Sequence, residues 1–250
     1  MRVLVVTAVA AEADAVAAGL GRYAASGVRE LTGGYEMTGH AQYTPRPGSV
    51  QIPVIDVMAG GVGPTAAAVA TATALASSPY DPPYHLVVSA GIGGGFAPHA
   101  PIGSLVVADS MVAADLGADS PDGFAAVDEL GFGRSVHRPP AELAARMAAV
   151  LNTDPAVPAL LAPVLTVSTA TGTAARTAEL TARHPRAAAE AMEGYGVAEA
   201  AAVHGVPCTE VRAISNAVGP RDRASWQIGR ALESLRNAFT LLTPVFEEPS

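Results

Sequence analysis

Short apolar runs of strand length alternate along this chain with alanine-rich segments of helical length. Two of the runs, Val3–Ala8 and His85–Ala90, contain no arginine and no carboxylate. A strand buried on both faces has this continuous apolar character, and strands that alternate with helices form parallel sheets covered on both faces. The sequence therefore predicts an α/β fold, a three-layer α/β/α domain with a mixed, mostly parallel central sheet.

The same periodicity predicts the other elements. Further strands are expected at Leu31–Thr38, Val50–Met58, Ser104–Ala113, Val164–Ala170, Ala187–Ala191 and Cys208–Ser215. Helices are expected at Ala10–Leu20, Pro64–Ser77, Pro140–Leu151, Arg176–His184, Gly196–His204 and Trp226–Leu242.

No internal repeat and no linker-like stretch divides the chain, so residues 1–250 are expected to form one domain. We expect Gly91–Gly95 to be a loop and residues 244–250 to be a flexible tail. Residues 116–135 are rich in Gly, Asp and Ser, which is typical of functional loops, so a loop or lid at the active site is expected there.

The charged residues exclude several classes of function. All 15 basic residues are arginine, and the formal net charge is −8. A Walker-type phosphate loop and a pyridoxal Schiff base each need a lysine, and nucleic-acid binding normally shows a basic stripe. We therefore expect neither chemistry and no nucleic-acid partner.

Composition also bears on the compartment. The uncharged stretch 58–80 holds glycines, prolines and threonines, which are poor material for a membrane span, so no membrane partner is expected. The single cysteine, Cys208, suits a reducing compartment, and a cytoplasmic protein is expected. The six histidines form no pair with metal-ligand spacing, so no metal and no cofactor are expected.

Glycine clusters suggest a dinucleotide-binding loop but do not match one well. Phe96 stands where the third glycine would follow Gly91 and Gly93, and Asp81 precedes the strand at whose end a ribose-binding acid belongs. These glycines are better explained by close passage of the backbone past a small ligand.

Three polar residues stand out against the alanine-rich background. Glu12 follows the first predicted strand, Glu193 lies between Met192 and a glycine, and Asn216 follows the last predicted strand. Ionised groups are rarely buried without partners, and α/β sheets bind ligands at the carboxyl ends of their strands. Each residue also has an ordinary explanation, such as a first-turn acid for Glu12 and a turn residue for Asn216. Together they suggest a pocket for a sugar and a base.

The combination resembles the nucleoside phosphorylase/nucleosidase superfamily, and in particular its methylthioadenosine/adenosylhomocysteine nucleosidase branch. The matching motifs are Val-x-Ala-x-x-x-Glu ending at Glu12, Ser89-Ala90-Gly91, Thr171-Gly172, Met192-Glu193 and Arg212-Ala213-Ile214-Ser215. Within that superfamily, 214–222 with Trp226, and 115–119 with Phe124, are similar to the futalosine hydrolases of menaquinone biosynthesis. The resemblance implies a nucleoside phosphorylase-like fold and an N-glycosyl hydrolase.

The resemblance also implies a role for each matching residue. In this superfamily the N-ribosidic bond breaks through an oxocarbenium-like state, as in other glycoside hydrolysis. Glu12 would be the general base that holds the attacking water, and Ser89 and Arg212 would position that water. Glu193 would accept hydrogen bonds from the ribose hydroxyls, and Met192 would line the sugar.

Asn216 departs from the adenine-specific nucleosidases, which carry aspartate there. A carboxylate would face the carbonyl of hypoxanthine as acceptor against acceptor, whereas an amide can donate to the carbonyl and accept from N7–H. Sites built on such hydrogen bonds reject the wrong partner by factors on the order of 10⁴. We therefore expect a catalytic role for Asn216 with a 6-oxopurine base, as in futalosine, and expect Gly91 and Ser215 to bind the substrate.

Two further features concern the ends of the substrate. Alanines occupy positions 174–175, in the loop where an aromatic residue usually stacks on the base, so Phe124 or Tyr195 is a candidate replacement. The carboxyphenyl end of futalosine needs a cation, for which Arg221 and Arg223 are candidates.

Glu12 favours hydrolysis over phosphorolysis. A phosphorylase holds a phosphate dianion beside the anomeric carbon, and two like unit charges about 4 Å apart repel by roughly 4 kcal/mol at an effective dielectric of about 20. We expect no arginine beside Ser89 to offset that repulsion.

Three alternatives remain open. A methylthioadenosine/adenosylhomocysteine nucleosidase would release adenine, a non-catalytic nucleoside-binding protein would retain its ligand intact, and a nicotinamide-binding oxidoreductase would bind a dinucleotide. The resemblance further implies a homo-oligomer, most simply a dimer.

Overall fold

The computed structural model describes residues 1–42, 55–78 and 84–247. Its strands are β1 (Val3–Thr7), β2 (Tyr23–Leu31), β3 (Tyr35–Gln42), β4 (Ile55–Ala59), β5 (Leu86–Gly95), β6 (Leu105–Ala113), β7 (Gly117–Ser120), β8 (Gly123–Ala126), β9 (Val136–His137), β10 (Ala159–Thr166), β11 (Ala189–Ala191) and β12 (Cys208–Ala217). Its α-helices are α1 (Ala10–Gly19), α2 (Pro64–Ala76), α3 (Ala141–Leu151), α4 (Ala174–Arg183), α5 (Gly194–Val203) and α6 (Ile228–Glu247).

Most of these strands form one mixed sheet. Among the described residues it has ten strands in the order β11-β10-β6-β12-β5-β1-β4-β3-β2, with β9 paired to β6. The inner strands β4, β1, β5 and β12 run parallel to one another. The predicted α/β class and mixed, mostly parallel sheet are confirmed.

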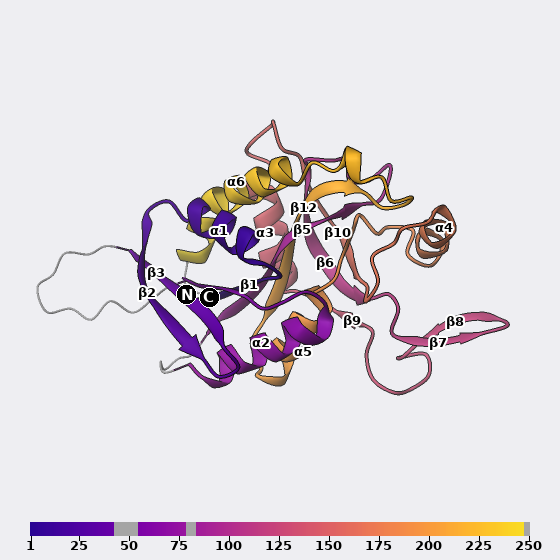
Figure 1. Cartoon of the computed structure of the whole chain (residues 1–250), viewed down its shortest axis with the longest axis horizontal. Helices are drawn as coiled ribbons and strands as arrows, with labels where there is room; N and C mark the ends of the chain where they lie inside the picture. Colours follow the sequence, from indigo (N-terminus) through magenta and orange to yellow (C-terminus); the bar gives the residue numbers. More distant parts are fainter. Residues whose placement is uncertain (43–54, 79–83, 248–250) are drawn as a thin grey trace, which may run out of the picture.

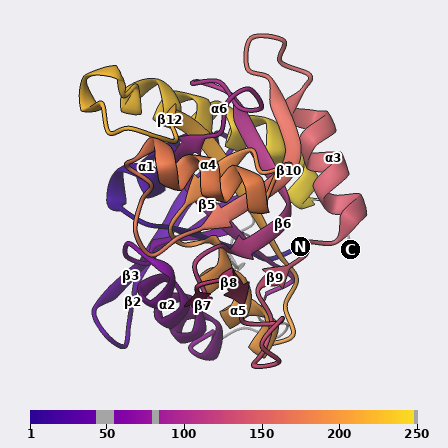
Figure 2. The same ribbon diagram turned by 90° about the vertical axis from the view of Figure 1, so that its right-hand side faces the viewer.

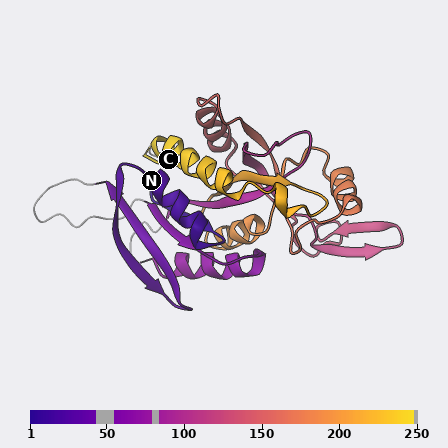
Figure 3. The ribbon, with the colours of Figure 1, turned by 45° about the horizontal axis from the view of Figure 1, so that its top comes forward.

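Helices cover both faces of the sheet. Figures 1 and 3 show α1, α3 and α6 on one side and α2 and α5 on the other. Alternate residues of β1 enter the two resulting cores: Val3 and Val5 pack in the first, Leu4 and Val6 in the second. All four side chains are fully buried, which explains why this strand has no polar face.

One end of the sheet closes on itself. Besides its place beside β10, β11 pairs antiparallel with β5, so β5, β12, β6, β10 and β11 form a ring. The loop expected at Gly91–Gly95 is therefore wrong, because these residues continue β5. A Cβ on Gly93 would lie 2.8 Å from the Glu190 carbonyl, so the missing side chain serves the close approach of β11 rather than a turn.

The strand expected at Leu31–Thr38 is also wrong in its bounds. The turn of the β2–β3 hairpin falls inside it, at Gly33 and Gly34, whose φ angles are 87° and 78°. Glycine adopts such angles without steric cost. The strand expected at Val50–Met58 overlaps β4, and residues 50–54 lie outside the described residues.

The carboxyl-terminal helix is longer than predicted. A flexible tail over 244–250 is wrong for 244–247, because α6 continues to Glu247 and buries Val245 and Phe246. The backbone carbonyl of Phe246 also accepts a hydrogen bond from the amino terminus at 3.1 Å. Residues 248–250 lie outside the described residues.

The segment 116–135 contains a two-stranded hairpin, β7–β8, that projects from the body of the protein (Figure 1) and points toward the viewer in Figure 2. The ring of Phe124 on β8 lies 4.2 Å from the guanidinium carbon of Arg183, at the end of α4. This contact places the hairpin against α4.

In the ranges that the structure describes, no helix combines the length and the apolar character needed to cross a membrane.

Candidate active site

A cavity of about 680 Å³ lies where the carboxyl ends of β1, β5, β11 and β12 meet. Ligands bind at this edge of α/β sheets, so its position alone makes it the candidate site. Five of the eight residues predicted to act on or bind the sugar and base line it: Glu12, Met192, Glu193, Ser215 and Asn216. Residues far apart in the sequence thus converge on one cavity.

Glu12 is fixed by backbone donors from two elements. One carboxylate oxygen accepts hydrogen bonds from the N–H groups of Ala8 (2.9 Å) and Val9 (3.2 Å), at the start of α1. The other accepts from the Ile92 N–H of β5, at 2.8 Å. The side chain is 3% exposed and still lines the cavity. These contacts hold a buried carboxylate in one orientation toward the cavity.

Arg212 lies beneath the cavity among carboxylates. Its Nε donates to Glu210 Oε1 at 2.7 Å, and its Nη1 lies 3.2 Å from Glu193 Oε2. Its Nη2 donates to Ser89 Oγ at 3.0 Å. Burial lowers the pKa of Arg212, but Glu210, Glu193 and Glu12 together raise it above the usual value. Arg212 is therefore a permanent cation.

Glu193 connects α5, Arg212 and the loop before α2. Its Oε1 accepts the Gly63 N–H at 3.2 Å, and its Oε2 accepts the Met192 N–H at 3.3 Å. The side chain is 5% exposed and lines the cavity. A buried carboxylate fixed in this way can accept hydrogen bonds from hydroxyl groups in the cavity.

Glu210 completes the buried cluster. Burial raises its pKa, while the ion pair with Arg212 acts in the opposite direction. A Cβ on Gly194 would collide with its carboxylate, so the glycine after Glu193 makes room for Glu210. No sequence pattern pointed to this residue, because it lies inside an apolar strand pattern.

Asn216, also in the lining, is held by its neighbours. The Ser215 hydroxyl donates to Asn216 Oδ1 at 2.8 Å, and Asn216 Nδ2 donates to the Ala217 carbonyl at 3.0 Å. The second N–H of the amide and the second lone pair of Oδ1 remain for a ligand.

Three of the residues predicted to act on or bind the sugar and base do not line the cavity. Ser89 and Arg212 are fully buried beneath it. Gly91 lies under Glu12: a Cβ there would be 2.6 Å from Glu12 Oε1 and 2.7 Å from Arg212 Nη1. The expectation of no arginine beside Ser89 is wrong, because Arg212 reaches it from the adjacent strand β12.

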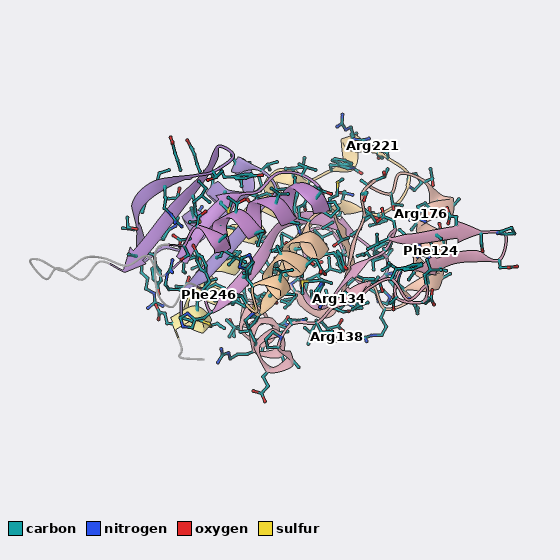
Figure 4. The ribbon with its side chains drawn as sticks, turned by 90° about the horizontal axis from the view of Figure 1, so that it is seen from below. Phe124, Arg134, Arg138, Arg176, Arg221 and Phe246 are labelled. Carbon is teal, nitrogen blue, oxygen red and sulfur yellow. The ribbon has the colours of Figure 1, made fainter. Side chains whose placement is uncertain are left out.

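The aromatic candidates are corrected as well. Phe124 contacts Arg183, and the Tyr195 ring packs against His137, so neither lines the cavity. The aromatic residue in the lining is Trp226. Figure 4 shows Phe124 on the projecting hairpin and Arg221 on a separate segment at the edge of the molecule.

Arg221 and Arg223 both line the cavity beside this tryptophan. Each guanidinium carbon lies 5.7 Å from the centroid of the Trp226 ring. This places two cations and one aromatic ring together at the cavity.

Sequence reasoning missed a third acidic residue in the lining, Glu190 on β11. It is 7% exposed, and burial raises its pKa, although hydrogen bonds from Thr171 act in the opposite direction. Its place in an alanine-rich strand between two buried alanines was the available signal. For metals, no group of three or more His, Cys, Asp or Glu side chains in the described residues could hold an ion.

Comparison with known proteins agrees with this geometry. The sequence pattern of the Phosphorylase superfamily matches residues 2–243. A futalosine hydrolase of Streptomyces coelicolor is 58% identical over 77% of this chain and 80% of its own length. A futalosine hydrolase of Acidothermus cellulolyticus is 42% identical over 96% of this chain and 89% of its own length.

Solved structures show the same fold. The native structure of futalosine hydrolase of Helicobacter pylori superposes with a TM-score of 0.77 at 19% identity, over 99% of this chain and 98% of that one. An adenosylhomocysteine nucleosidase of Streptococcus pyogenes in complex with 5-methylthiotubericidin gives 0.79 at 19% identity, over 100% and 98%. At these identities the structures support the fold alone. By its sequence relatives, the chain belongs to the phosphorylase superfamily and, within it, to the futalosine hydrolase family.

Proposed function

We propose that this chain hydrolyses the N-ribosidic bond of futalosine, releasing hypoxanthine and dehypoxanthine futalosine, as a step of menaquinone biosynthesis. The observation that carries the proposal is that Glu12, Glu193 and Asn216 line a single cavity. Its relatives named futalosine hydrolase give the substrate.

The two carboxylates, Glu12 and Glu193, act at the ribose. Positive charge develops on the ribose ring as the bond breaks, so a carboxylate near the ring stabilises the transition state more than the ground state. Glu12 holds the attacking water and takes its proton, a contribution of typically ~10²–10⁴-fold. Glu193 accepts hydrogen bonds from the ribose hydroxyls, and Met192 lines the sugar. Arg212 and Ser89 act from beneath by positioning Glu193.

The amide of Asn216 serves the base. Because the Ser215 hydroxyl donates to Oδ1, the Nδ2 group is directed to the other side. Nδ2 donates to the 6-carbonyl and Oδ1 accepts from N7–H of the leaving hypoxanthine. An adenine base would present an amino group to that donor, which disfavours the methylthioadenosine alternative.

Water is the acceptor rather than phosphate. Glu12, Glu190 and Glu193 all line the cavity, and a phosphate dianion there would meet like charge. Arg212, the cation beside Ser89, is fully buried and already engaged by Glu210 and Glu193.

Arg221, Arg223 and Trp226 bind the carboxyphenyl end of the substrate. A tryptophan face suits the benzene ring, and guanidinium groups bind carboxylates with charge-assisted hydrogen bonds. Both guanidinium groups lie near the tryptophan ring, so they can reach the carboxylate of a benzene ring that stacks on it.

The whole chain acts as one nucleosidase domain, in the cytoplasm and as a homodimer, with 116–135 closing over the bound substrate. The exposed ring of Phe132 in that segment, at 81% exposed, supports an interaction there. Light scattering after size-exclusion chromatography measures the dimer; a monomer at micromolar concentration would contradict it.

The substrate is tested by incubating the purified protein separately with futalosine and with methylthioadenosine and separating the products by chromatography. Hypoxanthine release from futalosine at a kcat/KM at least 100-fold above adenine release supports the proposal. Preferential adenine release would favour the methylthioadenosine nucleosidase, and intact nucleosides after prolonged incubation would favour a binding protein.

A further inference from the structure

Glu190 has no assigned contact with the substrate so far, although it lies in the same cavity. Its side chain is 7% exposed and comes from β11, the short strand that closes the ring. A carboxyl group is costly to bury, so its position in a ligand cavity calls for a partner.

Glu190 and Asn216 flank the same residue of β5. Gly94 is the register partner of Glu190 on one side and of Asn216 on the other. Neighbouring strands lie about 4.8 Å apart, so the two flanking backbones are separated by roughly 10 Å. That span admits a planar purine with a hydrogen bond at each edge.

Gly94 itself lies close to the Asn216 side chain. A Cβ on Gly94 would lie 3.3 Å from Asn216 Nδ2 and 2.8 Å from a methyl group of Val218. A side chain at this position would occupy the space next to the amide. The absence of a side chain at Gly94 therefore leaves room for the Asn216 amide and for Val218 between the two flanking strands.

Thr171 orients the Glu190 carboxyl and leaves part of it unused. The Thr171 N–H donates to Oε1 at 2.8 Å, and its hydroxyl donates to Oε2 at 2.5 Å. A carboxylate can accept about four hydrogen bonds, so two positions remain. Thr171 itself lines the cavity, which places the oriented carboxyl at its wall.

We propose that Glu190 is a specificity-determining residue that accepts a hydrogen bond from N1–H of a 6-oxopurine. A 6-oxopurine carries a proton on N1, whereas a 6-aminopurine presents a lone pair there, which a carboxylate repels. Asn216 reads the edge with the 6-substituent and N7, and Glu190 reads N1. The inference rests on the proposed function and names the group that completes recognition of its base.

The test compares wild type with Glu190→Gln on futalosine and on its 6-amino counterpart, in which adenine replaces hypoxanthine. A glutamine has the same shape but can donate to N1 of adenine as readily as it accepts from N1–H. Loss of a charge-assisted hydrogen bond lowers kcat/KM for futalosine by about 10- to 100-fold, mainly through KM. For the 6-amino substrate kcat/KM is unchanged or higher, so the 6-oxo to 6-amino ratio falls.

Two more variants accompany this test, one as a control and one as a second test of Glu190. Glu233→Gln, on the exposed face of α6 with its side chain 59% exposed, leaves the ratio unchanged. Thr171→Val removes one donor that orients the carboxyl and lowers the ratio by a smaller factor, which keeps the test available if Glu190→Gln folds poorly. Calorimetry with free hypoxanthine and adenine gives the same comparison without turnover.

The outcomes separate the two proposals. Suppose that wild type hydrolyses futalosine and that Glu190→Gln and Thr171→Val both keep the 6-oxo to 6-amino ratio of kcat/KM within two-fold of the wild-type value. This result overturns the role of Glu190 and leaves the proposed function intact. Hydrolysis of neither nucleoside by wild type overturns the function, and binding of the free bases then decides the role of Glu190.

Discussion

The Ile92 backbone N–H donates a hydrogen bond to Glu12 Oε1 at 2.8 Å, which ties the first turn of α1 to β5 at the cavity. The remaining backbone donors to this carboxylate come from Ala8 and Val9. Glu12, the proposed general base, is thus held by main-chain groups, which few side-chain substitutions can disturb.

Replacing Glu12 by glutamine removes the base but keeps the shape of the side chain. We expect kcat for futalosine to fall by about 10²–10⁴-fold while calorimetry still detects nucleoside binding. Asp14→Asn, an exposed change in the same helix, serves as the control and retains wild-type kcat. Turnover within ten-fold of wild type in Glu12→Gln would remove Glu12 from the mechanism.

Gly91 is predicted to tolerate no side chain. Its Cβ would lie 2.6 Å from Glu12 Oε1, which accepts the Ile92 N–H, and 2.7 Å from Arg212 Nη1, which is paired with Glu193. Gly91→Ala is expected to lower the free energy of unfolding by about 1–3 kcal/mol and to lower kcat as Glu12 shifts. Gly229→Ala has open space around its Cβ and is the matched control in urea denaturation. Equal free energies of unfolding for Gly91→Ala and Gly229→Ala would contradict the predicted clash of a side chain at position 91 with Glu12 and Arg212.

Asn216→Asp tests how the base is selected. The carboxylate places an acceptor opposite the 6-carbonyl, so the futalosine to methylthioadenosine ratio of kcat/KM is expected to fall by about 10- to 100-fold. Asn237→Asp, an exposed change on α6, controls for the added charge. An unchanged ratio would refute the pairing of the amide with the 6-oxo group.

Arg212→Met tests the buried charge cluster. It leaves Glu210 and Glu193 without their cation in a site where all three side chains are at most 6% exposed. We expect the free energy of unfolding to fall by about 3–5 kcal/mol, the cost of removing one partner of a buried pair. Arg236→Met, at 53% exposed, is expected to change it by less than about 1 kcal/mol. A similar small change in Arg212→Met would show that the cluster does not stabilise the fold.

Arg221→Gln and Arg223→Gln test the far end of the substrate. Loss of a charge-assisted hydrogen bond to the substrate carboxylate is expected to raise KM for futalosine by about 10-fold in at least one variant. KM for inosine, which has no carboxyphenyl group, stays unchanged in both. An equal rise in KM for both substrates would show that these arginines maintain the structure of the site and do not bind the substrate carboxylate.

The sequence predicted the layers and most of the site because both leave local signals. Apolar runs such as Val3–Thr7 identify strands with two buried faces, and Glu12, Glu193 and Asn216 stand out against alanine. Closure of the sheet by β11 left no such signal, since it depends on pairing between distant strands.

That closure explains the main omissions. The glycines of β5 look like a loop when read in order, yet Gly93 lacks a side chain where β11 approaches, and Gly91 lacks one where Glu12 and Arg212 lie. The same pairing brings Glu190 into the cavity, where its place between two alanines was the one local signal. Arg212 was recognised, but its position beneath the cavity follows from the register of β12 on β5.

Hypoxanthine release from futalosine, measured with and without inorganic phosphate, tests the central claim most directly. A hydrolase with Glu12 as its base gives equal rates under both conditions and no sugar phosphate among the products. A rate that depends on phosphate, or the absence of free hypoxanthine, would contradict it.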